Sequence, residues 1–182
     1  LYSILIRDVQ CYPQAFAAAA MMLGELATVP RALILDVGGF TADYLLLKNG
    51  RADLSTCDSL ENGVILLYNR IRSKASSDLD ILLEETDVDA ILLQGQGSSY
   101  GEEAAALVEY QAQEFVNDML GALRERQLDL RMGRVIFVGG GACLLRRQIE
   151  ASGKVAHPVF VEDVNANAKG FEYLYRCTVT GA

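Results

Sequence analysis

The sequence contains few of the residues that metal and disulfide sites require. Its 182 residues include no tryptophan, one histidine and four cysteines, Cys11, Cys57, Cys143 and Cys177, none of them in a Cys-x-x-Cys pair. A zinc site needs closer ligand pairs, and a disulfide framework needs a secreted context. We therefore expect buried free thiols, and an ordinary structural histidine at His157.

Positive charge is also scarce. The 16 Lys and Arg residues are outnumbered by 24 Asp and Glu residues, which gives a formal net charge of −8 and a pI near 4.7. A surface of this sign repels phosphate backbones, so nonspecific binding to nucleic acid or to an anionic membrane is not expected. Any bound phosphate must be held by directed backbone N–H groups at a local site.

Long apolar runs and targeting segments are missing. The longest charge-free run near the start lies between Asp8 and Glu25; it has 16 residues and is interrupted by Gln10, Pro13 and Gln14. That run is too short and too polar to span a bilayer. No secretory signal opens the chain, and the first residue is not Met. We expect a cytoplasmic piece of a longer protein, with no membrane partner.

The residues that are present suit one packed α/β domain. Hydrophobic residues make up 51% and charged residues 22% of a chain within the usual size of a domain. We predict a strand over Tyr2–Cys11, then a helix that Gln14 opens and that Gly24 and Pro30 end. Three strands of an antiparallel meander follow over residues 32–37, 41–47 and 51–57, with Asn49-Gly50 as a hairpin turn.

The second half of the chain alternates helices and strands. Apolar residues at helical spacing predict a helix over 59–73, two small helices within 76–101 and a long helix over 102–126. A buried strand over 134–138 leads through a glycine turn into a helix. A short strand over 157–161 and a last helix over 165–176 complete the chain.

The segment Asp36-Val37-Gly38-Gly39-Phe40-Thr41-Ala42-Asp43 turns one predicted strand back into the next. Glycines admit backbone angles closed to other residues and leave no side chain in the way, so consecutive N–H groups can face a phosphate. The Thr41 hydroxyl adds a donor, and the Asp36 carboxylate can hold Mg²⁺ through water. The alternative is a tight hairpin with a capping aspartate and no ligand.

A second glycine turn, Gly139-Gly140-Gly141-Ala142, joins an apolar strand to a helix about 100 positions later. Glycines there let a flat ring approach the backbone closely, while a helix N-terminus favours negative charge. One such turn is weak evidence, because glycines also serve helix packing. Two glycine turns in this order, each after a suitable strand, indicate a nucleotide site.

The order of DVGGFTAD, a long helix, IFVGGGACLL and NANAKGFEYL resembles the actin and Hsp70 ATPase superfamily. Within it, the closing Asn-Ala-x-Gly-Phe run resembles bacterial plasmid-segregation actins of the ParM and StbA type. The resemblance implies the C-terminal ATPase half of such a protein. It implies a ribonuclease H-like α/β fold, with a mixed five-stranded sheet and helices on both faces. Residues 1–30 are then the last strand and connecting helix of a preceding domain, and residues 31–182 are actin-like domain II with its closing connector helix.

The resemblance also assigns roles to residues. It places ATP or GTP with Mg²⁺ in the site, Asp36 on the metal side, and Gln14 where the hydrolytic water is oriented. Glu61 is either near the ribose or at a solvated helix start. The backbone around the β and γ phosphates is that of Gly38, Gly39, Phe40 and Thr41, and the adenosine motif is Gly139, Gly140, Gly141 and Ala142.

The implied function is an ATPase that forms filaments and segregates plasmid DNA through an adaptor protein, without contacting the DNA itself. No first phosphate loop precedes Asp36 in this sequence. We therefore expect the chain alone to be inactive. Two alternatives stay open: a sugar-type or acetate-type kinase or exopolyphosphatase of the same superfamily, and a non-hydrolysing structural adaptor with the same fold.

Overall fold

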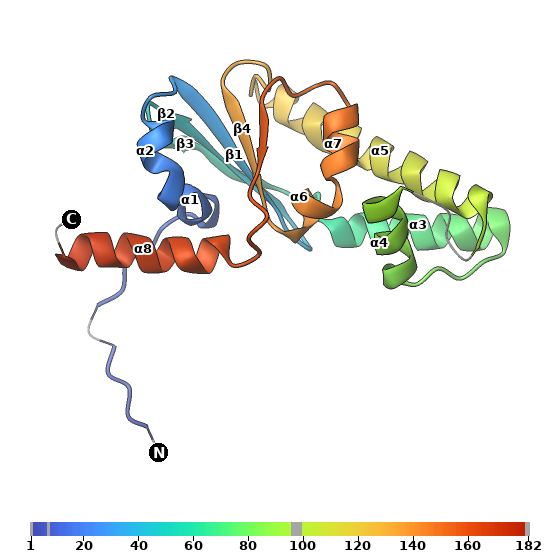
Figure 1. Cartoon of the computed structure of the whole chain (residues 1–182), viewed down its shortest axis with the longest axis horizontal. Coiled ribbons are helices and arrows are strands. Elements are labelled where there is room, and N and C mark those ends of the chain that lie inside the picture. The colour runs from blue at the N-terminus through green and yellow to red at the C-terminus, as the bar shows by residue number, and fades with distance from the viewer. Residues whose placement is uncertain (1, 7, 96–99, 181–182) are drawn as a thin grey trace.

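A five-stranded mixed sheet lies at the centre of the computed structural model, which describes residues 2–6, 8–95 and 100–180 (Figure 1). The strand order is β3-β2-β1-β4-β5. Strands β1 (Arg31–Val37), β2 (Ala42–Lys48) and β3 (Arg51–Leu60) form an antiparallel meander, and β4 (Arg134–Val138) and β5 (Pro158–Phe160) extend it in parallel from β1. The predicted fold class is confirmed.

Strand β1 is the middle of the sheet and is buried on both faces. Leu33 and Leu35 pack into one core, while Ala32 and Ile34 pack into the other, as the two-residue period of a strand requires. The predicted turn after β2 is also present, with left-handed φ values of 50° at Asn49 and 73° at Gly50.

One face of the sheet carries the larger core. It is covered by α3 (Val64–Leu79), α4 (Glu85–Gln94), α5 (Glu102–Glu125), α6 (Gly140–Leu144) and α7 (Arg146–Ala151). Helix α5 packs on α3, α4 and α7. Its buried stripe includes Phe115 and Met119, which share the core with Phe137 of β4. The predicted long amphipathic helix is therefore confirmed within one residue.

The other face carries α1 (Gln14–Ala19), a 3₁₀ turn (Ala20–Met22), α2 (Leu23–Leu26) and α8 (Ala166–Thr180), as Figure 1 shows. The first and last helices of the chain pack against each other. They approach so closely that a Cβ placed on Gly170 would lie 1.7 Å from the carbonyl oxygen of Ala17. Small residues on both helices therefore make the contact.

Three predictions about local structure are corrected. The predicted strand Tyr2–Cys11 is wrong: residues 2–6 and 8–13 carry neither strand nor helix, because no neighbouring strand satisfies their backbone. The helix predicted from residue 59 begins at Val64, since β3 continues to Leu60. The first of the two small helices is the end of α3, and the second is α4; residues 96–99 lie outside the described part.

Two further observations concern the cysteines and membranes. Cys11 and Cys57 are exposed, and Cys143 and Cys177 are partly exposed, so the expectation of buried thiols is wrong. Cys57 lies on β3, the edge strand of the sheet, which leaves it open to solvent. Among the described residues, no helix has the length and apolar character to cross a bilayer.

Candidate functional site

The two glycine turns meet at the carboxyl ends of the parallel strands β1 and β4. Asp36 near the end of β1 is in register with Val138 at the end of β4. Gly139 has a φ of +89°, and a Cβ there would lie 2.5 Å from the Asp36 Oδ1 and 2.6 Å from the carbonyl oxygen of Val37. Open α/β sheets bind ligands at this edge, so the fold brings both predicted motifs into one site.

The turn between β1 and β2 is held by the first residues of α3. Three successive carbonyl oxygens of the turn each accept a backbone hydrogen bond from the start of that helix. The pairs are Val64 N to Gly38 O at 3.1 Å, Ile65 N to Gly39 O at 2.9 Å and Gly63 N to Phe40 O at 3.1 Å. Gly63 is required here, because a Cβ on it would lie 2.2 Å from the Gly39 carbonyl oxygen.

These bonds fix the direction of the next three N–H groups. In a trans peptide the N–H points opposite to the preceding C=O, and the described chain contains no cis peptide bond. The N–H groups of Gly39, Phe40 and Thr41 therefore point away from α3. None of the hydrogen bonds between described residues uses them as donors. The N–H of Gly38 is not available to a ligand, because it donates to the carbonyl oxygen of Thr41 at 2.8 Å. The turn thus presents three consecutive unused donors rather than the four expected, an arrangement that favours an anion.

The glycines of the two turns are needed for different reasons. Neither Gly38 nor Gly39 has a positive φ, so the expectation that they supply unusual backbone angles is wrong. Gly141 is required by packing, since a Cβ on it would lie 2.7 Å from Val64 Cγ1. Gly140 has no atom within 4 Å of a built Cβ. No described residue explains the missing side chain at Gly140, whereas a ligand on this turn would.

Asp36 is the buried acid of the site, with 4% of its surface exposed. Asn167 at the start of α8 donates its Nδ2 to the Asp36 Oδ2 at 2.7 Å, and Gln14 at the start of α1 also bonds to the carboxylate. Burial raises the pKa of Asp36, and nearby Asp43 adds to this, while the bonds from Asn167 and Gln14 oppose the rise. No Lys, Arg or His among the described residues forms an ion pair with Asp36, and a cation bound beside this carboxylate would favour its charged form.

Asp43 of β2 lies opposite Asp36 in the sheet and makes its own polar contacts. Ser59 donates to its Oδ1, and the Thr41 hydroxyl donates to its Oδ2 at 3.5 Å. The bond from Thr41 is long, and a hydroxyl rotates about its C–O bond. Thr41 is therefore available to another acceptor at the mouth of the turn, as its predicted role requires.

Asn167 is the residue that sequence reasoning missed. The run that contains it helped to identify the family, but only the structure brings it to Asp36, which is 131 positions away. The Asn167 Oδ1 is buried and has no hydrogen-bond partner. A buried acceptor without a donor is costly. An asparagine in the first turn of the closing helix was the only signal in the sequence.

The other predicted residues occupy different positions around the site. Phe40 has 79% of its surface exposed at the tip of the turn, so only its backbone serves the site. Ala142 is fully buried in the larger core, and its side chain packs there. Glu61 is exposed in the segment between β3 and α3.

The donor set fits a phosphate with a hydrated divalent cation. Mg²⁺ keeps several waters and needs one or two carboxylates together with phosphate oxygens. Asp36 would supply one carboxylate, and Asn167 Oδ1, which is buried without a hydrogen-bond partner, would accept from a metal-bound water. No group of three or more His, Cys, Asp or Glu side chains among the described residues is arranged to hold a metal by itself.

Comparison with solved structures identifies the fold. An archaeal actin homologue, Ta0583, superposes with a TM-score of 0.69 at 20% identity, over 91% of this chain and 55% of that one. The Alp12 filament structure gives 0.64 at 16% identity, over 90% and 53%. Bacillus thuringiensis ParM with ATP gives 0.57 at 12% identity, over 83% and 47%. These similarities show an actin-like fold, and the chain spans about half the length of these relatives.

A search of the curated proteins found no match. A family model describing the C-terminal part of archaeal MreB-like actin homologues matches residues 34–151, well over half of the chain. That range contains both glycine turns and Asp36. The chain therefore belongs to the family of archaeal MreB-like actin homologues, within the actin-like ATPase superfamily.

Proposed function

We propose that this chain is the nucleotide-binding half of an actin-like ATPase that forms filaments. The observation that carries the proposal is the set of three unused N–H groups at Gly39, Phe40 and Thr41, in a turn that is held in place by the start of α3. In a protein with a net charge of −8, such directed donors are how a phosphate chain is held. The Gly139–Ala142 turn then accepts the nucleoside.

The ligands of the neighbouring structures support the choice of ligand. The archaeal homologue was solved in complex with ADP, and ParM of Bacillus thuringiensis with ATP, ADP and AMPPNP. We infer ATP or GTP with Mg²⁺ as the ligand of this chain. Bound Mg²⁺ would neutralise charge on the transferred phosphoryl group.

The residues of this chain have distinct tasks in the proposal. Asp36 anchors the hydrated metal, and Asn167 keeps its carboxylate in one orientation. Gln14 is at the start of α1 and bonds to Asp36, which places its amide beside the metal-side carboxylate, where it can orient the attacking water. Positioning of this kind supplies most of the rate in phosphoryl transfer.

The domain assignment and the inactivity of the chain alone are parts of the same proposal. Residues 1–30 and helix α8 connect to a preceding domain that supplies the other wall of the cleft. The packing of α1 on α8 supports this. The first turn of each helix places a polar side chain beside Asp36: Gln14 of α1 and Asn167 of α8. Half of the phosphate contacts are then missing from the chain alone, and hydrolysis by it should be slow.

Plasmid segregation through an adaptor protein, as in the ParM and StbA type, is the finer role that we propose. Two structural neighbours support it: one is ParM of Bacillus thuringiensis, and the other is the Alp12 filament structure. The acidic charge of the chain agrees with indirect contact to DNA.

Two other functions are compatible with the same fold. A kinase or exopolyphosphatase of the superfamily would use a carboxylate base near the acceptor, and an amide at Gln14 disfavours that reading. A structural adaptor would have no use for three N–H groups without acceptors. An ATPase that forms filaments is therefore the function with the best support.

The test uses a longer protein that contains this chain and its preceding domain. Gln14→Ala should leave nucleotide affinity within a few-fold and slow phosphate release by ~10²-fold, because the water's alignment matters only toward the transition state. Filaments, followed by light scattering, should then persist. Gln94→Ala, at the exposed end of α4, is the control. Unchanged phosphate release and filament decay in Gln14→Ala would refute the role of Gln14.

A further inference from the structure

A small cavity of about 80 Å³ lies where the end of α5, the loop that leads to β4 and the segment after α7 meet. Three of the residues that line it are cations: Arg124, Arg131 and Lys154. We call this cavity the cationic niche. The loop that leads to β4 precedes that strand, whereas the second glycine turn follows it. The niche therefore lies at the opposite end of β4 from the candidate nucleotide site.

The three cations come from segments that the packing of the chain brings together. Leu130 is buried and anchors the loop before β4. The Arg131 guanidinium reaches the carbonyl oxygen of Gly153, which directly precedes Lys154, at 3.5 Å. The Lys154 ammonium donates to the carbonyl oxygen of Asn117 in α5, also at 3.5 Å. Both bonds are long, and each of these side chains has further N–H donors. Both cations can therefore bind another acceptor.

These cations have no carboxylate partners. None of the ion pairs between described residues includes Arg124, Arg131 or Lys154. The two arginines of α7 differ, because each of them pairs with a glutamate. Three unpaired cations around one small cavity repel one another, and a bound anion would remove this repulsion.

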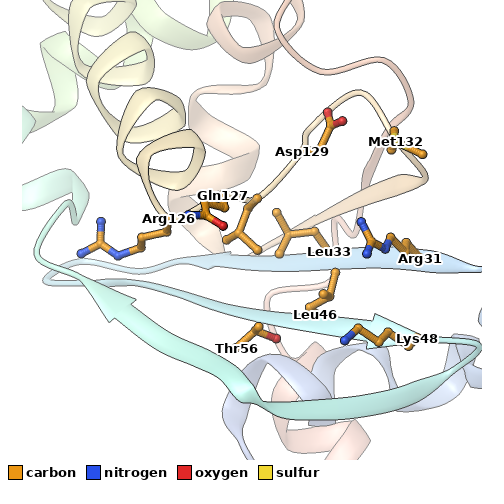
Figure 2. A pocket seen from close by; sticks show the side chains of 10 residues that line it. Arg31, Leu33, Leu46, Lys48, Thr56, Arg126, Gln127, Asp129 and Met132 are labelled. Atoms are coloured by element: carbon orange, nitrogen blue, oxygen red, sulfur yellow. The ribbon is translucent and has the colours of Figure 1, made fainter.

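The acidic residue among the described residues that line the niche is Asp129. Its Oδ1 accepts from the Arg131 backbone N–H at 2.8 Å, which fixes the loop. Figure 2 shows Asp129 on this loop, with its carboxylate directed away from Leu33 and Leu46 of the sheet. The charge of Asp129 and the negative end of the α5 dipole, about half a charge, together leave an excess of roughly one and a half positive charges. In a chain with a net charge of −8, this excess is a local exception.

The size and the donors of the niche indicate which anion it takes. Its volume of about 80 Å³ is well below the ~300–1,000 Å³ of pockets that enclose larger organic ligands. The niche therefore admits a small oxyanion and excludes a nucleoside. Guanidinium and ammonium groups form charge-assisted hydrogen bonds to phosphate oxygens. An inorganic phosphate ion supplies acceptor oxygens in four directions and a negative charge that matches the positive excess.

We propose that the cationic niche is a binding site for inorganic phosphate, held by Arg124, Arg131 and Lys154. Bound phosphate links the end of α5 and the loop before β4 to the segment after α7, and it stabilises the folded chain by mass action. The proposal goes beyond the proposed nucleotide site, since the two sites lie at opposite ends of β4 and share no residue.

The experiment is a titration of the ¹⁵N-labelled chain with sodium phosphate, at an ionic strength kept constant with sodium chloride. We expect saturable shifts of the backbone amides of Arg131, Gly153 and Lys154. Arg131→Gln and Lys154→Met each remove one charge and keep the backbone bonds of the loop. Each variant should bind phosphate about ten-fold more weakly, which corresponds to the loss of one hydrogen bond to a charged group.

Thermal unfolding of the same proteins is a second readout. Phosphate is excluded from protein surfaces in general and stabilises every variant to some extent. Binding adds to this effect only where the niche is intact. The unfolding midpoint of wild type should therefore rise more with phosphate than that of Arg131→Gln or Lys154→Met, and equal rises would contradict the proposal.

Matched controls are Arg51→Gln and Arg72→Gln, which change exposed arginines outside the niche. Neither arginine forms an ion pair with a described residue. Both controls should bind phosphate like wild type. Shifts that never saturate, shifts confined to residues 39–41, or wild-type affinity in both niche variants would overturn the site. Because residues 39–41 report the candidate nucleotide site, failure of one site is distinguished from failure of the other.

Discussion

The two faces of the sheet differ in what they contribute. The α3 and α5 face has a broad core that includes Phe115 and Phe137, whereas the α1 and α8 face is covered mainly by alanines and a few aliphatic side chains. Asp36 belongs to the second face, because it shares the strand parity of Ala32 and Ile34. The candidate site is thus on the thinner side.

This difference suggests that one face of the sheet mainly stabilises the fold and that the other mainly forms the ligand site. We call the α3 and α5 face the thick face and the α1 and α8 face the thin face. The thick face supplies most of the buried apolar area and therefore most of the hydrophobic stabilisation. The thin face brings the first turns of α1 and α8 to one buried carboxylate, through Gln14 and Asn167. Changes on the thick face should act on stability, and changes on the thin face should act mainly on ligand binding and on the packing of the two connecting helices.

The largest expected effect is on the thick face. Phe115→Ala should lower the free energy of unfolding by about 3–5 kcal/mol, the usual cost of emptying a buried aromatic site. Phe171→Ala, on the partly exposed surface of α8, should cost less than about 1 kcal/mol. Urea unfolding of both variants measures the difference. Equal losses would contradict the division between the faces.

The next effect tests the contact between α1 and α8. Gly170→Ala places a methyl group where the Ala17 carbonyl oxygen now lies, so the helices must separate, at a cost of about 1–3 kcal/mol. The control is Gly121→Ala in α5, where a built Cβ meets nothing within 4 Å. That change should be neutral or stabilise by about 0.5–1 kcal/mol. Thermal unfolding of the two variants distinguishes them, and a harmless Gly170→Ala would show that the close approach is not needed.

At Asp36 we expect a smaller change in the free energy of unfolding, and it should be a gain in stability rather than a loss. Its pKa is raised in the folded state, so its contribution to stability is complete below the ordinary pKa of an aspartate and is lost as pH rises through the folded value. Asp36→Asn should therefore stabilise the ligand-free chain at neutral pH, where the buried charge is removed, with a smaller gain near pH 4. Unfolding at both pH values measures this. A variant less stable than wild type at neutral pH would show that the carboxylate is structural.

The smallest effect on stability is expected at Gly140. Gly140→Ala adds a Cβ where no atom lies within 4 Å, so the free energy of unfolding should change by less than about 0.5 kcal/mol. Nucleotide affinity of the longer protein should nevertheless fall, because the methyl group occupies the space assigned to the nucleoside. Fluorescent nucleotide titration is the measurement. Unchanged affinity would remove this glycine from the site.

The sequence was sufficient to predict the sheet and both glycine turns. Continuous apolar strands such as β1, and the Asn49-Gly50 turn, carry local signals that the tertiary structure does not override. The strand predicted at residues 2–11 is wrong, because a strand needs a neighbouring strand to pair with, and a local sequence pattern does not show whether one is present. Asn167 was not predicted as a site residue, because its role comes from a contact with Asp36 that the packing of α8 makes.

The central claim is that the N–H groups of Gly39, Phe40 and Thr41 hold the phosphates of a nucleotide. The most direct test is titration of the ¹⁵N-labelled chain with Mg²⁺ and ATP, followed by amide chemical shifts in two-dimensional NMR spectra. We predict saturable shifts at these three amides and at Gly140, all reduced in Asp36→Ala. No change at residues 39–41 at saturating nucleotide would contradict the claim.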